Sequence, residues 1–146
     1  MSMERSISFE VAGSAPSVNS AYYFIRKGKR TIKVKSTKAK QWIKEVITAF
    51  FEAYEEYDII DNDLCPVFSD GDLIVELTFW FNDKRRHDID NYQKLTIDAL
   101  TGLLWKDDNQ IVELVSKKYS DTNYTKTCIK VKRRGDELWK AVQQSL

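Results

Sequence analysis

The chain has no long apolar run, so the sequence predicts no helix that crosses a membrane. Such a helix needs about 20 consecutive apolar residues, and no stretch of the 146-residue sequence approaches that length. The first nine residues alternate charged and apolar side chains, so we expect no signal peptide. These features predict a protein with no membrane partner and a cytoplasmic location.

Cysteine and histidine are scarce, which limits the chemistry that the chain can carry. There are two cysteines and one histidine. Cys65 and Cys128 have a spacing that fits no zinc pattern, and we expect both to be reduced thiols rather than a disulfide. No serine or cysteine arrangement indicates a covalent mechanism.

The net charge of only +1 conceals a strong segregation of charge along the chain. Residues 26–44 contain nine lysines and arginines and no acid, whereas residues 52–76 contain nine acids and no base. Residues 117–140 are basic again. Segregated charge creates local potentials that a net value hides. Each basic run is either a solvated face or a surface that holds a polyanion.

The hydrophobic pattern predicts an α+β fold with a mixed β-sheet packed by two main helices, in a single domain that spans residues 1–146. The most apolar strand, 73–81, should be central because it is apolar on nearly both faces. A hairpin with a basic tip at 27–29 should join two short strands. The predicted strands are 4–12, 21–25, 31–34, 73–81, 110–119 and 124–133, and the last two flank a turn at 121–123. Residues 13–20 are predicted to form a loop. The predicted helices are 38–57, 89–104 and a short one after 135.

A group of acidic residues around the second helix is the most informative motif. Asp88 and Asp90 are two residues apart, and Lys94 lies on the helix face of Asp90. A second pair, Asp107 and Asp108, follows that helix. Crowded carboxylates raise the cost of ionising one another. Mg²⁺ removes that cost, and one or two carboxylates with phosphate oxygens commonly hold it.

We therefore expect carboxylates from both ends of this helix to converge on a cation and to support metal-assisted chemistry on a phosphate ester. Lys94 can neutralise charge that develops on the phosphate, and Arg85 and Arg86 can form paired bonds to phosphate oxygens. Tyr22, Tyr23 or Trp105 can stack on a base, although core burial is the simpler role for Trp105.

Each of these residues also has a plain structural alternative. Asp88 or Asp90 can cap the helix, and Asp107 and Asp108 can belong to a turn. Nucleotide-sugar transferases also use two aspartates at this spacing, but the chain is short for a nucleotide domain and has no glycine loop for phosphates.

Several motifs together resemble the RusA-type Holliday-junction resolvases of bacteria and their phages. They are Asp-Ile-Asp-Asn-Tyr-Gln-Lys at 88–94, Asp-Ala-Leu-Thr-Gly at 98–102 and Trp-Lys-Asp-Asp-Asn-Gln-Ile at 105–111. Ala-Pro-Ser-Val-Asn-Ser at 15–20, followed by Tyr22, is also similar. The resemblance extends from about residue 6 to residue 132, and the combined motifs are far more specific than one pair of aspartates.

The resemblance implies a homodimeric endonuclease, encoded by a bacterium or a prophage, that uses Mg²⁺ or alternatively Mn²⁺ to nick four-way DNA junctions symmetrically. It places the essential acids at Asp88, Asp90 and Asp108 and the essential lysine at Lys94, with Asp107 as a further metal ligand. The DNA contacts that we expect are Arg85, Arg86, His87, Asn91, Asn19, Lys27, Lys29, Arg30, Lys33 and Lys35.

Two features depart from the family pattern. His87 stands where the family often has a basic residue, and the acidic insert at 58–72 is long. These departures bear on cleavage rate and sequence preference rather than on the class of reaction. A DNA-binding protein without catalysis is the alternative, since it would share the basic runs but would gain nothing from the acidic residues.

Overall fold

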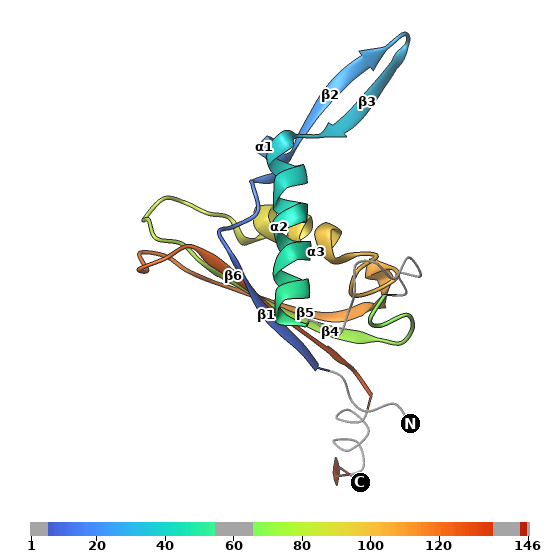
Figure 1. The fold of residues 1–146 in the computed structure, drawn as a ribbon, viewed down its shortest axis with the longest axis vertical. Helices are drawn as coiled ribbons and strands as arrows, with labels where there is room; N and C mark the ends of the chain where they lie inside the picture. The colour runs from blue at the N-terminus through green and yellow to red at the C-terminus, as the bar shows by residue number, and fades with distance from the viewer. Residues whose placement is uncertain (1–5, 55–65, 136–143, 146) are drawn as a thin grey trace.

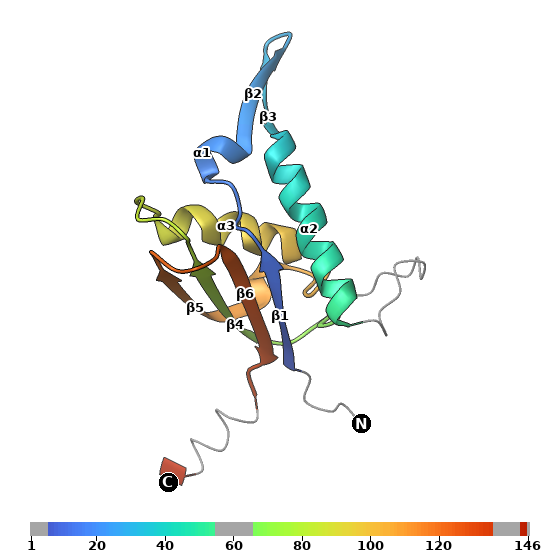
Figure 2. The same ribbon diagram turned by 60° about the vertical axis from the view of Figure 1, so that its left-hand side comes forward.

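A computed structural model describes residues 6–54, 66–135 and 144–145. It has a four-stranded sheet, two main helices on one face of that sheet, and a two-stranded hairpin that projects away from it (Figures 1 and 2). The predicted α+β class and mixed sheet are therefore confirmed. The predicted C-terminal helix, Cys65 and most of the acidic insert lie outside the described residues.

The sheet has the strand order β1-β6-β4-β5. These strands are β1 (Ser6–Ala12), β6 (Lys126–Arg133), β4 (Leu73–Trp80) and β5 (Ile111–Tyr119). β4 is an interior strand, as predicted, and pairs antiparallel with β6 and parallel with β5. β5 and β6 flank the predicted turn, where Asp121 has a positive φ of 57°, but β4 lies between them.

Helix α2 (Thr37–Ala53) begins as predicted and packs on β1 and α3. The Ser36 hydroxyl accepts a hydrogen bond from the Ala39 N–H at 3.2 Å, which caps the helix. The helix ends earlier than expected, because Tyr54 takes a non-helical conformation in which its hydroxyl bonds both backbone groups of Ser8. No helix in the described ranges is long and apolar enough to cross a membrane.

Helix α3 (Ile89–Leu100) connects the parallel strands β4 and β5 and runs antiparallel to both. It stops four residues before the predicted end, because Gly102 has a positive φ of 94° that turns the chain back. Trp105 is fully buried, and its indole N–H donates to the Thr101 hydroxyl at 2.9 Å. The core role of Trp105 is thus confirmed.

The hairpin of β2 (Tyr22–Lys27) and β3 (Arg30–Lys35) confirms the predicted hairpin with a basic tip. It lies next to the N-terminal end of α2 and points away from the sheet (Figure 1). The chain enters it through the short helix α1 (Val18–Ala21), in a stretch predicted to be a loop. A helix of four residues is too short to show a helical period in its apolar residues.

Cys128 on β6 is a free cysteine, and its surroundings predict low reactivity. Burial, followed by the nearby Glu10 carboxylate at 3.3 Å, raises the pKa of this thiol to about 11. Because only the thiolate is nucleophilic, we expect iodoacetamide at pH 8 to modify Cys128 about 100-fold more slowly than an ordinary thiol. Mass spectrometry on the Cys65→Ser chain measures this rate, which should keep rising up to about pH 11. A plateau near pH 9 would contradict the expectation, and unfolding in urea should restore ordinary reactivity.

Candidate active site

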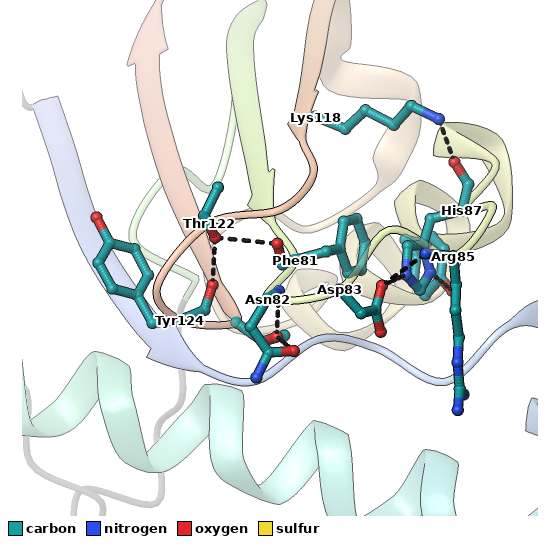
Figure 3. Close-up of polar contacts among 10 residues, drawn as sticks. Phe81, Asn82, Asp83, Arg85, His87, Lys118, Thr122 and Tyr124 are labelled. Carbon is teal, nitrogen blue, oxygen red and sulfur yellow. Dashed lines mark hydrogen bonds and ion pairs between the residues drawn. The ribbon is translucent and has the colours of Figure 1, made fainter.

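The loop between β4 and α3 is held by side chains from the connection between β5 and β6 (Figure 3). The Thr122 hydroxyl donates to the Phe81 carbonyl at 3.0 Å, and the Asn82 N–H donates to the Thr125 hydroxyl at 3.0 Å. These contacts hold the first residues of the loop that leads from β4 to α3. The sequence analysis did not single out the two threonines, because neutral hydroxyls more than 40 residues away carry no motif.

His87 has both ring nitrogens engaged within this loop. Nε2 lies 2.7 Å from the Asp83 carboxylate, Nδ1 lies 2.7 Å from the Tyr92 hydroxyl, and the ring stacks on Phe81. The bond to His87 is the main cause that lowers the pKa of Asp83. In this arrangement His87 orients the first turn of α3 and has no free ring nitrogen to offer to DNA.

Asp88 and Asp90 are exposed at the beginning of α3. Asp88 occupies the N-cap position, yet its side chain makes no capping bond and instead accepts from Arg86 Nε at 3.2 Å. The Asp90 carboxylate has no hydrogen-bond or ion-pair partner among the residues that the structure describes. The capping alternative is therefore not realised by either side chain, and both carboxylates face solvent.

Lys94 lies one turn further along α3, on the same side as Asp90. Its Nζ is 3.7 Å from Oδ2 of Asp98, which also accepts the hydroxyl of Tyr22 at 3.3 Å. Burial, and then the charge of Asp98, raise the pKa of Tyr22, so its hydroxyl stays protonated and donates. This contact joins the base of the hairpin to the side of α3 that carries Lys94.

Asp107 and Asp108 have different surroundings. The Asp107 side chain accepts the Asn109 N–H at 2.9 Å and caps the short 3₁₀ helix η1 (Asp108–Gln110). Gln110 completes this capping box by accepting from the Asp107 N–H at 3.0 Å, so the turn interpretation is confirmed for Asp107. Asp108 is exposed, and its carboxylate has no bonding partner in the described part of the chain.

The two acidic groups lie near opposite ends of strand β5. The backbone carbonyl of His87, next to Asp88, accepts a hydrogen bond from Nζ of Lys118 near the end of β5. Asp108, in contrast, comes shortly before the first residue of that strand. A strand rises about 3.3 Å per residue, so the two ends of β5, and with them the two acidic groups, are on the order of 20 Å apart. The described ranges contain no group of three or more acidic, histidine or cysteine side chains placed to hold one metal ion. A single chain therefore does not bring these carboxylates together, because α3 runs antiparallel to its flanking strands.

The expected DNA contacts fall into two regions. Arg85 and Arg86 are exposed beside Asp88, and Asn91 is partly buried in the first turn of α3. The hairpin carries an exposed group of cations, namely Lys27, Lys29, Arg30, Lys33 and Lys35. Asn19 lies in α1, but its side chain is outside the described part of the structure.

Exposed carboxylates and a lysine at one helix end, beside a cationic arm, are typical of a protein that acts on a polyanion. The family model described as Endodeoxyribonuclease RusA matches residues 15–132, which include every predicted site residue. The chain belongs to this family of DNA endonucleases. Among curated proteins, none matches the chain with significant similarity.

Proposed function

We propose that the chain is a Mg²⁺-dependent endonuclease that resolves four-way DNA junctions by paired nicks. The observation that carries the proposal is the exposed carboxylate of Asp90, which has no partner among the described residues and lies one turn from Lys94 and beside Asp88. Membership of the family supports cleavage of DNA. The cations of the hairpin would bind the phosphate backbone of that DNA.

Asp88 and Asp90 suit Mg²⁺ because the ion typically takes one or two carboxylates and completes its shell with water and substrate phosphate oxygens. Neither carboxylate is used in capping, and both are exposed. When bound, the ion would polarise the phosphate and lower the pKa of its bound water. Mn²⁺ is an alternative ion for the same oxygen ligands.

The basic residues around this pair would hold the phosphate. Lys94 is kept in place by Asp98 at 3.7 Å and would donate to the charge that develops on the phosphate oxygens. Arg86 neutralises Asp88 in the free protein, and a cation at Asp88 would release its guanidinium to bind the DNA backbone.

Asp108 would enter the site from a second copy of the chain. It lies by the start of β5, whereas Asp88 and Asp90 lie by the end of that strand, so we propose that the two groups meet only across two copies. A two-fold dimer that pairs the α3 end of one copy with the η1 end of the other would form two equal sites. Two such sites would account for symmetric nicking of two strands.

The decisive experiment uses the full chain and a labelled four-way junction, with and without Mg²⁺, beside a linear duplex of the same length. We expect paired nicks in opposite strands of the junction only with Mg²⁺, and little cleavage of the duplex. Junction binding that persists in EDTA, without any nicking in Mg²⁺, would favour the non-catalytic alternative.

A further inference from the structure

The two faces of the β2–β3 hairpin differ in chemistry. Directly opposite residues of an antiparallel pair share a face, and the register pairs Phe24 with Lys33 and Tyr23 with Val34. What we call the cationic face therefore carries Tyr22, Phe24, Arg26, Thr31, Lys33 and Lys35. What we call the apolar face carries Tyr23, Ile25, Ile32 and Val34, with Lys27 and Arg30 at the tip.

Phe24 is an exposed aromatic residue that lies among the cations of the cationic face. It is 67% exposed, which is the largest value among the exposed large hydrophobic residues that the structure describes. Lys33 lies directly across from it, and Arg26 is the next residue on the same face. An aromatic ring for a base and cations for the backbone are the pair of features with which proteins bind unpaired nucleic acid.

The cationic face leads directly to the candidate active site. Tyr22, at the base of this face, donates to Asp98 at 3.3 Å, and Asp98 lies 3.7 Å from Lys94. Lys33 lies over the Tyr22 ring at 4.2 Å, so the cations begin where α3 is contacted. A polyanion lying along the cationic face would therefore reach the side of α3 that carries Lys94 and Asp90.

We propose that the cationic face binds the branch point of a DNA junction and that Phe24 stacks on a base where the strands exchange. The inference rests on the proposed function and adds the element that would select branched DNA. In a linear duplex each base is covered on both sides, so a ring can enter only by unstacking a step. At a branch the stack is interrupted, and a base face is available without that cost.

The test compares Phe24→Ala with Tyr23→Ala, a change of the neighbouring aromatic on the opposite face. Binding of the full chains to a four-way junction and to a linear duplex is measured in EDTA, where metal-dependent cleavage is prevented. We expect Phe24→Ala to weaken junction binding about tenfold, the loss of one stacked base, and duplex binding less than about twofold. Tyr23→Ala should leave the junction-to-duplex ratio unchanged.

Two further variants separate stacking from folding of the hairpin. Phe24→Leu keeps an apolar side chain without a ring and should lose the preference, whereas Phe24→Trp should keep it. A 2-aminopurine at the branch should be quenched by the wild-type chain and not by Phe24→Leu. An unchanged ratio for Phe24→Ala, or an equal loss in Tyr23→Ala, would overturn the proposal. Mg²⁺-dependent nicking by the wild-type chain separates the two failures, because its absence would refute the function itself.

Discussion

Asp90→Asn is expected to abolish Mg²⁺-dependent nicking of a four-way junction while junction binding stays intact or becomes stronger. The substitution keeps the size of the side chain and removes a carboxylate that has no bonding partner among the described residues, so the fold should be preserved. Losing a metal ligand forfeits several kcal/mol of charge stabilisation, which is a rate loss on the order of 10³-fold or more. Binding should not suffer, because a negative charge that repels phosphates is removed.

Nicking rates at saturating protein, together with binding in EDTA, measure both parts of this expectation. Asp121→Asn is the matched control, since it makes the same change at an exposed acid whose φ of 57° asparagine readily adopts. Its ion pair with Lys84 is long, at 3.7 Å, and exposed, so little stability is at stake. The control should nick at the wild-type rate, and an Asp90→Asn chain that does the same would show that the site is misassigned.

Mixing two inactive variants should restore nicking if Asp108 acts across the dimer. Asp90→Asn and Asp108→Asn chains are expected to be inactive alone. In a mixed dimer one site would receive both substitutions and the other neither. After subunit exchange about half of the dimers are mixed, so roughly a quarter of the sites should be intact for a two-fold dimer. These sites should give single nicks instead of paired ones.

The mixture also discriminates among the arrangements of the site. If each chain builds its own site, every site in the mixture carries a substitution and no activity returns. If Asp108→Asn alone nicks normally, Asp108 has no part in the chemistry. A double variant carrying both substitutions, mixed with wild type, provides the matched control, because exchange then leaves every mixed dimer with two damaged sites under the cross-dimer arrangement.

The elements that the sequence predicted well are those with a strong local pattern. β4 is apolar at every position except Glu76 and Thr78, and Trp42, Val46 and Phe50, which recur at helical spacing, are buried in α2. Element ends were less predictable, since the end of α2 depends on a bond between Tyr54 and Ser8, which are 46 residues apart. The neighbours of β6 in the sheet also depend on such long-range contacts.

The spacing of Asp88, Asp90 and Lys94 predicted that they lie together, and the structure places Asp88 at the N-cap of α3 and the other two one turn apart in that helix. Their roles in metal binding and catalysis stay predictions. That Asp88 is an aspartate did not show whether it caps the helix, because capping and metal binding both use a carboxylate. The position of Asp108 was beyond local reasoning, since it follows from the parallel pairing of β4 and β5. The same pairing leaves each chain with one part of the proposed ligand set at each end of β5.

The place of β6 within the sheet has a consequence for how the protein is made. Among the strands that the structure describes, β6 comes last in the sequence, yet it lies between β1 and β4 and pairs with both. A ribosome that stops before Lys126 releases a chain in which the first strand has no neighbour, and the anchors at Thr122 and Thr125 emerge only shortly before that strand. Prematurely terminated translation products therefore lack the strand that joins β1 to β4. Under the proposed function, we expect such fragments not to fold and hence not to cut DNA.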